Sequence, residues 1–576
     1  MIHVIFSKKH RKLVLLKQVA LVLLFFPVAL FAAKLPKIQG LEVNNEILLN
    51  VQHRLTERYQ GKSIQAQPEA DLKSEITKAL EPYGYFKPHI VIASPKGQLN
   101  IMIHPGPRIH ISGLNIQIVG EGASNPDIQH ALHDIPIHIG QGFETNTYEA
   151  TKNALSNTAE TQGYIHASFT TAQVLIDTDR NTADILLILD TGPRYYYGQV
   201  TFDPTHISPD LLKRYVPFKL GEPYSTEQLL KLNSNLAGSG YFNAVDVLPT
   251  LANSNKLDVP IHVSLKPVKR ITYNIGLGYG TDTGPRGRLG VNVIPVNRAG
   301  HKFNMIAQGS FVQNTVQGQY IIPGRNPIND NYIINGGYTH LDFSAGRSSG
   351  VLLGVGQQHI VPSYQRTLSV NALDENYKYT SLQAESARVF FPKILLTWYQ
   401  HSDTLFSPTG YKITLSGLAA SKALLSDTSL AQALIDARAA FVVAPIRTRL
   451  FLHSIQSLTS IQQITQLPLS LAPLLGGAED MKGYAFNSIG PGKTVSYAGI
   501  EIQKETWDKV YFYGLLDAGT TYNPVARIGY YDAGLGVMWV SPVGPIKIAV
   551  AQAIHQNVQQ VAYQHPRLVV TIGPDL

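Results

Sequence analysis

From residue 267 onward, apolar residues alternate with small or polar ones in runs of up to ten residues. In the first run, Ile271–Gly280, an apolar side chain occupies every second position from Ile271 to Tyr279. Such alternation gives a strand with one apolar and one polar face. A strand of about 9–11 residues crosses a bilayer when it is tilted. The pattern therefore predicts a sheet whose apolar face meets lipid.

The same alternation recurs through the C-terminal part of the chain, and turn-forming clusters separate the runs. Further runs lie at Tyr332–Thr339, Tyr411–Gly417, Ile546–Ala551 and Arg567–Gly573. At about 19 residues per strand and connection, residues 267–576 hold about 16 antiparallel strands, an even number as in bacterial barrels. Strands in lipid must close into a barrel, because an open edge leaves backbone groups unpaired in hydrocarbon. A soluble β-sandwich or propeller is the alternative, which the aromatic-rich alternation disfavours.

Residues 1–33 have the features of a secretory signal peptide. A basic stretch precedes the apolar run Val19–Phe31, which is shorter than the roughly 20 residues of a membrane-spanning helix. An N-terminal membrane anchor is the alternative. Without the five basic residues of this segment the net charge falls from +8 to +3, which gives no argument for nucleic acid as a partner. The sequence has no cysteine, which suits the oxidising periplasm.

Two short motifs recur at domain-sized spacing between the signal and the barrel. A glycine followed by an aromatic residue ends a helix-like segment at Gly84, Gly163 and Gly240, which are 79 and 77 residues apart. The sequence Gly-Pro-Arg begins a strand-like segment at Gly106 and again at Gly192. Glycine permits the left-handed turn that ends a helix, and Pro with Gly fixes a turn before a strand. We predict three α+β modules, at residues 34–104, 105–190 and 191–266.

No arrangement of side chains in the sequence predicts catalysis, a cofactor or a metal. His130 and His133 are spaced to share a helix face, with His138 nearby, but zinc needs further ligands. The nearest acid, Asp134, is expected to lie off that face. The glycines of the first barrel strand are spaced by two, which is strand alternation and not the phosphate-binding G-x-G-x-x-G pattern. We therefore expect a protein that is not an enzyme.

Several motifs in the barrel sequence resemble those of the BamA/TamA superfamily of outer-membrane assembly and secretion proteins. They are, in chain order, Tyr279–Arg286, Lys482-Gly483-Tyr484 after Gly476-Gly477, Asp517-Ala518-Gly519, Gly534-Leu535-Gly536 with Ser541–Pro545, and Ile572–Leu576. The resemblance covers nearly the whole chain after the signal, and it implies that the N-terminal modules are POTRA domains. Three such modules before a 16-stranded barrel favour the TamA branch, because BamA has five modules and two-partner secretion transporters have two.

The resemblance implies that two of these motifs meet in the barrel lumen. Lys482, Gly483 and Tyr484 would form the tip of an inward-folded sixth extracellular loop, and Asp517 and Gly519 the strand motif that it contacts. The family usually has arginine at the first position of the loop motif, which grips a carboxylate with two parallel hydrogen bonds, whereas lysine is a point charge. We therefore predict a Lys482–Asp517 contact that is looser than the arginine version. A solvated loop-tip lysine is the alternative.

The seam between the first and last barrel strands is the predicted weak point of the wall. Its candidate residues are Ile271, Gly276, Gly278, Gly280, Thr571 and Gly573. Glycines weaken packing along the edge of the first strand, and the last strand ends at Gly573-Pro574, where proline has no hydrogen-bond donor. A seam that opens sideways offers a backbone edge on which a client strand can form. Gly278 and Thr571 are the expected positions for a crosslink across it.

These features predict an outer-membrane assembly or translocation factor whose N-terminal modules lie in the periplasm of a Gram-negative bacterium. The expected partners are unfolded outer-membrane client proteins of the autotransporter type and outer-membrane lipid, with no nucleic acid. By resemblance, a TamB-like inner-membrane protein is a further partner. The first module is its expected contact, because it is farthest from the barrel in the sequence. A dedicated secretion pore for a single effector, like a two-partner-secretion transporter, is the alternative.

Overall fold

The structure of the chain is a computed structural model, and it describes residues 37–40, 45–60, 64–94, 99–250, 257–380, 382–401, 405–523, 526–542, 544–556 and 565–573. The predicted signal peptide lies outside the described residues. The chain divides into two units, one with the first two modules and one with the barrel and most of the third module. Among the described helices, none is long and apolar enough to cross a membrane.

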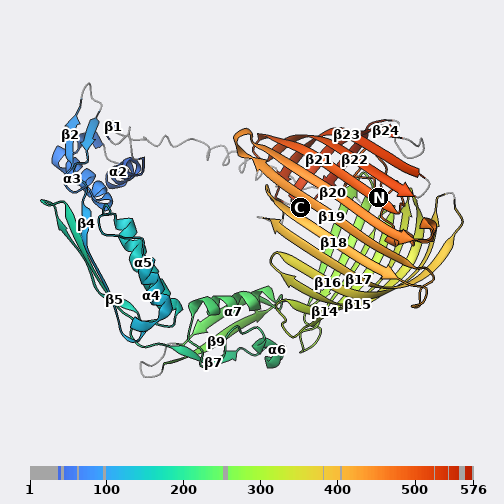
Figure 1. Cartoon of the computed structure of the whole chain (residues 1–576), viewed down its shortest axis with the longest axis horizontal. Coiled ribbons are helices and arrows are strands. Elements are labelled where there is room, and N and C mark those ends of the chain that lie inside the picture. The colour runs from blue at the N-terminus through green and yellow to red at the C-terminus, as the bar shows by residue number, and fades with distance from the viewer. Residues whose placement is uncertain are drawn as a thin grey trace, which may run out of the picture. The chain divides into compact units, whose positions relative to one another are not determined.

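Three small sheets follow one another along the N-terminal part of the chain, and each has the strand order first-third-second (Figure 1). In the first two sheets the first and third strands run parallel, while the second and third form an antiparallel hairpin. In the first module, Val51 and Leu55 of one helix and Ile76 of the next are buried with Ile101 and Ile103 of the central strand. The sheet and its two helices therefore share one apolar core.

The elements of the three modules have the following bounds: β1 (Lys37–Gln39), α2 (Asn45–Arg58), α3 (Glu69–Leu80), β2 (His89–Ala93), β3 (Asn100–His104); β4 (His110–Val119), α4 (Pro126–His133), α5 (Thr145–Thr161), β5 (Ser168–Asp177), β6 (Thr182–Asp190); β7 (Tyr196–Phe202), α6 (Pro209–Lys213), α7 (Thr226–Gly238), β8 (Phe242–Pro249) and β9 (Asp258–Pro267).

The two repeated sequence motifs meet at the joint between the first and second modules. The backbone N–H of Ile109 donates to the carbonyl of Gly84 (2.9 Å). Arg108, from the Gly-Pro-Arg motif, donates through Nε to the carbonyl of Tyr83 (3.1 Å) and lies over the ring of Tyr85. The arginine thus satisfies a carbonyl at the end of the preceding helical turn, where orphan acceptors occur.

The joint between the second and third modules repeats this geometry. The N–H of Tyr195 donates to the carbonyl of Gly163 (2.9 Å). Arg194 donates through Nε to the carbonyl of Gln162 (2.9 Å) and lies over the ring of Tyr164. At each joint, the Gly-aromatic motif near the end of one module binds the Gly-Pro-Arg motif that begins the next module.

The third module is fastened to the first hairpins of the barrel. The Tyr241 hydroxyl donates to the carbonyl of Gly300, in the turn between the second and third barrel strands. Lys302 Nζ donates to the carbonyl of Ser239 (2.6 Å) and lies over the Tyr241 ring, 4.7 Å from its centroid. A Cβ at Gly300 would lie 2.2 Å from Leu211 Cδ2 in α6, so the module packs directly on this turn.

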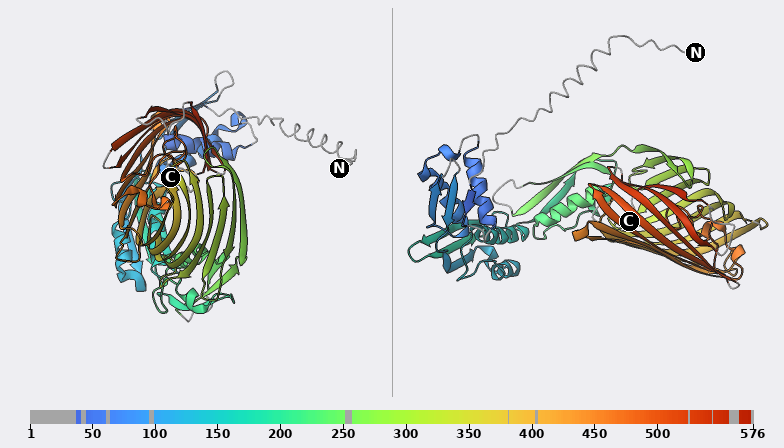
Figure 2. Two further views of the ribbon diagram at one scale, coloured as in Figure 1. Left: turned by 90° about the vertical axis from the view of Figure 1, so that its right-hand side faces the viewer. Right: turned by 90° about the horizontal axis from the view of Figure 1, so that it is seen from above.

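The C-terminal part is a 16-stranded antiparallel sheet whose strands follow one another in sequence order, which confirms the predicted barrel (Figure 1). Figure 2 shows the strands curving around a lumen. Outward-facing side chains such as Leu353, Val355, Leu368 and Val370 are exposed, as a lipid-facing wall requires.

The barrel strands are β10 (Ile271–Gly280), β11 (Gly284–Val293), β12 (Lys302–Gly309), β13 (Gln313–Pro323), β14 (Asp330–Phe343), β15 (Gly346–Val361), β16 (Tyr364–Tyr379), β17 (Glu385–His401), β18 (Gly410–Ala420), β19 (Leu430–Val443), β20 (Thr448–Ile461), β21 (Thr494–Trp507), β22 (Val510–Asn523), β23 (Ala526–Ser541), β24 (Gly544–Gln556) and β25 (Arg567–Ile572).

The expectation that Asp134 lies off the face of the two histidines is wrong. Asp134 is the C-cap of α4, and its carboxylate lies 3.0 Å from His130 Nδ1 and 3.1 Å from His133 Nδ1. Asp134 comes four residues after His130, a spacing that places two side chains on the same helix face, and it directly follows His133. Among the described residues, no group of three or more His, Cys, Asp or Glu is placed to hold a metal ion.

We predict that Gly300→Ala loosens the third module from the barrel, because the new methyl group collides with Leu211. The matched control is Gly221→Ala: both glycines have φ of +78°, but a Cβ at Gly221 meets nothing within 4 Å. The control should lower the free energy of unfolding only by the backbone strain, roughly 1 kcal/mol. Limited proteolysis of the third module should therefore speed up in Gly300→Ala and far less in Gly221→Ala. Equal cleavage rates would show that the packing at this turn does not hold the module.

Candidate functional site

The longest described connection of the barrel, residues 462–493 between β20 and β21, folds back inside the wall. Leu475 and Ile489 exchange two backbone hydrogen bonds of 2.9 Å, which close the stem of this loop. The tip, Met481–Tyr484, is buried. Its apolar side chains pack with Val495 and Tyr497 of β21. The loop is therefore a packed part of the barrel interior, and we call Met481–Tyr484 the loop tip.

The structure brings Lys482 and Asp517 together. Lys482 Nζ lies 3.3 Å from Asp517 Oδ2 in β22 and 3.5 Å from Glu501 Oε1 in β21, and it donates to the carbonyl of Asp480 at 3.4 Å. These distances exceed the roughly 2.7–2.9 Å of a close charge-assisted hydrogen bond. Only 8% of the Lys482 side chain is exposed, so it is not a solvated loop-tip residue.

The remaining residues of the loop motif reach the neighbouring strand. The Gly483 N–H donates to Asp532 Oδ2 in β23 (2.9 Å), and the Tyr484 hydroxyl donates to the Tyr531 carbonyl (3.2 Å). A Cβ at Gly483 would lie 2.7 Å from the backbone nitrogen of Ala553. Glycine is therefore required at the centre of the motif, because the loop backbone itself touches the wall.

Gly519, the second predicted residue of the strand motif, lies under the loop tip. A Cβ there would be 3.1 Å from Met481 Sδ. Asp517 also accepts a hydrogen bond from the Tyr497 hydroxyl (2.8 Å). The aspartate of the motif thus binds the loop, while its glycine leaves room for the loop.

Burial and charge set the protonation of the loop tip. Burial alone would lower the pKa of the Lys482 ammonium, but the charges of Asp517, Glu501 and Asp532 outweigh it, and the pKa is raised. Burial raises the pKa of the Asp480 carboxyl to about 6, although the N–H groups of Met481 and Gly476 donate to it. Lys482 therefore enters the lumen as a cation held by fixed carboxylates.

Sequence reasoning missed three charged residues of this site, Glu501, Asp532 and Lys547. Lys547 Nζ in β24 lies 2.9 Å from Glu501 Oε2, which joins a fourth strand to the cluster. Asp532 is the direct antiparallel partner of Asp517 in the strand register. A signal for Asp532 was present, because Asp532-Ala533-Gly534 repeats Asp517-Ala518-Gly519.

The seam is the second part of the site, and the structure leaves it largely unpaired. Within the described residues, β10 and β25 are the two ends of the sheet and share no strand ladder. Residues on both faces of β10 are exposed from Ile271 to Tyr279, including Gly276 and Gly278, and the exposed fraction of Leu277 is 90%. The last strand has six residues, against thirteen in the neighbouring β24.

The two edges touch near one end of the seam. The Val570 N–H donates to Thr281 Oγ1 (3.3 Å), just beyond the end of β10. Counted in antiparallel order from this contact, Thr571 lies level with Gly280, whereas the contact of Arg567 with Asp282 sets it level with Gly278, the position expected from the sequence. Gly573 follows the last strand and donates to the Pro545 carbonyl (3.0 Å), while Pro574 lies outside the described residues. We choose Gly280 and Thr571 for a crosslink, because both are next to the residues that form the Val570–Thr281 contact.

Family models match both the barrel and the third module of the chain. Residues 309–570 match the model of the Omp85 superfamily domain, and residues 195–268 match the POTRA model, described as a surface antigen variable number repeat. This chain is thus similar to the Omp85 superfamily over most of its barrel. It is therefore an outer-membrane β-barrel protein with periplasmic N-terminal domains, and its fold is that of outer-membrane insertion and secretion transporters.

The chain is similar to solved structures at low sequence identity. BamA from Haemophilus ducreyi, lacking POTRA domains 1–3, is 16% identical with a TM-score of 0.68, over 81% of this chain and 99% of that one. CdiB from Escherichia coli is 12% identical with a TM-score of 0.46, over 88% of this chain and 97% of that one.

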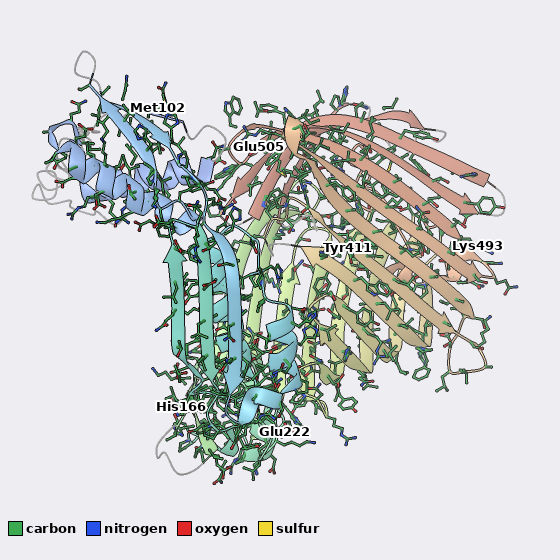
Figure 3. The ribbon with its side chains drawn as sticks, turned by 60° about the vertical axis from the view of Figure 1, so that its left-hand side comes forward. Met102, His166, Glu222, Tyr411, Lys493 and Glu505 are labelled. Atoms are coloured by element: carbon green, nitrogen blue, oxygen red, sulfur yellow. The ribbon has the colours of Figure 1, made fainter. Side chains whose placement is uncertain are left out.

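We predict that Lys482→Met destabilises the barrel by about 3–5 kcal/mol, because it leaves buried carboxylates without their cation. The matched control is Lys493→Met. Lys493 lies in the same loop and donates to the Gln462 carbonyl at an exposed position, and Figure 3 shows it at the opposite end of β21 from Glu505. The control should change stability by at most about 0.5 kcal/mol. The measurement is the temperature at which the folded barrel loses its faster gel mobility.

Equal unfolding temperatures for the two variants would show that the Lys482 contacts do not hold the loop. Exchange of the charges of Lys482 and Asp517 would be a poor test of their contact. A carboxylate at position 482 would face Glu501, which lies only 3.5 Å from the present Nζ. The exchanged pair is therefore expected to fail even though the contact is real.

Proposed function

We propose that this chain is an assembly and translocation factor of the TamA type. It inserts or exports autotransporter-like clients through the seam between β10 and β25, with a TamB-like inner-membrane protein as its partner. The observation that carries the proposal is the free edge of β10. Its backbone groups on the side away from β11 have no strand partner in the described part of the chain.

A free edge in a bilayer favours the addition of another strand. Unpaired N–H and C=O groups are costly in hydrocarbon, so a client segment that pairs with β10 lowers the free energy of both chains. The outward side chains Tyr273, Ile275 and Leu277 are exposed and apolar, which matches the lipid-facing surface that a growing sheet must present. Folding of the client thus supplies the driving force.

The buried loop separates this mechanism from simple conduction through the lumen. The loop tip packs on β21, β22 and β23 from inside, and the segment Leu467–Leu469 packs on the wall near β16 and β17. A dedicated secretion pore must displace this loop for each effector, whereas insertion through the seam needs only the edge of the barrel.

We predict that a disulfide between cysteines introduced at Gly280 and Thr571 blocks client assembly reversibly. The sequence has no cysteine, so the introduced pair has no competing thiol. Oxidation should stop assembly of an autotransporter client in proteoliposomes, and reduction should restore it. The matched control is a cysteine pair at Tyr338 and Val351, which are exposed and already paired across β14 and β15 and should have no effect when crosslinked.

Full assembly with the seam locked would contradict the proposal. Export of a soluble effector through the locked barrel, with a steady increase in bilayer conductance, would instead support a secretion pore. These outcomes separate the two functions in one preparation.

The proposed partner contact is the first module. Val91 and Met102 are cross-strand neighbours in its sheet, and both are exposed. Met102 is labelled in Figure 3. Exposed apolar side chains at such a position mark a surface available to a partner.

We predict that a photo-crosslinking residue at Met102 of the full-length chain captures an inner-membrane protein of TamB type. The control places the same residue at Leu230, which is an exposed apolar residue of the third module. Mass spectrometry of the crosslinked membranes identifies the product. Capture only of the barrel-assembly machinery, or equal capture from both positions, would contradict a partner contact at the first module.

A further inference from the structure

The turn after β10, the start of β25 and the loop tip meet at one buried ion pair. The Arg567 guanidinium, at the first residue of β25, binds the carboxylate of Asp282 in the β10–β11 turn through Nη2. The exposed fraction is 11% for the Arg567 side chain and 8% for Asp282. The pair bridges the two ends of a sheet that share no ladder, so it links strands that the backbone leaves apart.

Each partner of this pair also binds the loop, at different places. Arg567 Nη1 donates to the carbonyl of Lys482 (3.3 Å) and to that of Tyr484. The second oxygen of Asp282 accepts from the N–H of Ala478 (2.6 Å). The planar guanidinium has five donors in a fixed arrangement, which allows one arginine to hold a carboxylate and two carbonyls together.

We propose that Arg567 and Asp282 are positioning residues that couple opening of the seam to release of the loop. Suppose that β25 moves away from the β10–β11 turn. The hydrogen bonds of Arg567 to Lys482 and Tyr484 then pull these residues along with β25, while Asp282 stays bound to Ala478 in the turn's position. The loop tip cannot follow both. Full opening of the seam therefore requires the loop to leave the wall, and a loop held in place keeps this end of the seam closed.

The coupling divides the seam into two parts. From Ile271 to Tyr279, β10 is already free, so a client strand can pair there while the loop stays in place. The ion pair lies beyond Gly280, at the far end of this stretch. A client that pairs along β10 therefore reaches the ion pair last, and its final residues must displace it. This deepens the proposed function and rests on it wherever a client is concerned.

The test follows the loop and the seam separately in the full-length protein, without a client. Met481→Cys, buried in the loop tip, reports loop release by its labelling rate with a water-soluble maleimide. In a second background, the Gly280/Thr571 cysteine pair reports seam closure by its oxidation rate. Asp282→Asn should raise the labelling rate about tenfold or more and slow the seam crosslink by a similar factor, because a buried charge loses its partner.

An exchanged pair, Asp282→Arg with Arg567→Asp, separates the ion pair from the coupling. It restores attraction across the seam, but a carboxylate at position 567 faces the carbonyls of Lys482 and Tyr484. Crosslinking should therefore recover while labelling of the loop stays fast. The matched control is the exposed Arg347–Asp342 pair between β14 and β15, where Asp342→Asn should change neither rate.

Unchanged loop labelling in Asp282→Asn, or recovery of both rates in the exchanged pair, would overturn the coupling. If Asp282→Asn does not assemble, Arg567→Lys takes its place. It keeps the charge but not the planar donors, so labelling should rise while crosslinking is preserved, and an unchanged labelling rate would again overturn the proposal. Both rates are measured without a client, so failure of the coupling is distinguishable from failure of client insertion in the proteoliposome assay.

Discussion

Every backbone N–H and C=O within hydrocarbon needs a partner, and the rest of this structure depends on how that requirement is met. Fifteen strand pairings satisfy it between β10 and β25 in sequence order. The sixteenth, which would close the ring, is replaced by the contact of Val570 with Thr281 and by side chains. The wall is therefore strong everywhere that neighbouring strands are also neighbours in sequence, and weak where the two ends meet.

The loop of residues 462–493 is held inside the barrel partly by buried charges. Apolar packing at the same positions would be more stable. The loop tip brings the Lys482 ammonium between the buried acidic residues Glu501 and Asp517, and Lys547 also contacts Glu501. Buried ion pairs add little net stability, because desolvation offsets their attraction, but they are strongly directional. A loop bound by directional ion pairs occupies one position in the lumen. Because these pairs add little net stability, the loop can still be released. A loop held by apolar contacts alone would be harder to remove and less closely placed.

Local patterns made the fold predictable from the sequence, and the site only in part. The predicted bounds of the first barrel strand, Ile271–Gly280, are those of β10, because a period of two is visible within ten residues. The module count follows from repeated motifs for the same reason. The contact of Lys482 with Asp517 came from resemblance to a family, since nothing in the local sequence brings a loop residue to a strand 35 positions away.

The seam shows why the rest of the site could not be predicted from the sequence. Arg567 and Asp282 lie at opposite ends of the barrel sequence, and their contact exists only because the sheet curls back on itself. A ladder fixes register residue by residue, and β10 and β25 share none in the described part of the chain, so the pairing of Thr571 with Gly278 stays a prediction. Asp532 is different: its motif repeats that of Asp517, so the alternation of the two strands could have placed both carboxylates on one face.

The joints of the three N-terminal modules share one sequence motif, and the last joint lies beside the start of the free strand. In the first two joints, the Gly-aromatic motif binds the Gly-Pro-Arg motif of the next module. At the third, Tyr241 of the same motif binds Gly300 in the turn between β11 and β12. That turn follows Val293, which pairs with Ile271 at the start of β10. The third module is thus bound to the barrel near Ile271, the first residue of the unpaired strand β10.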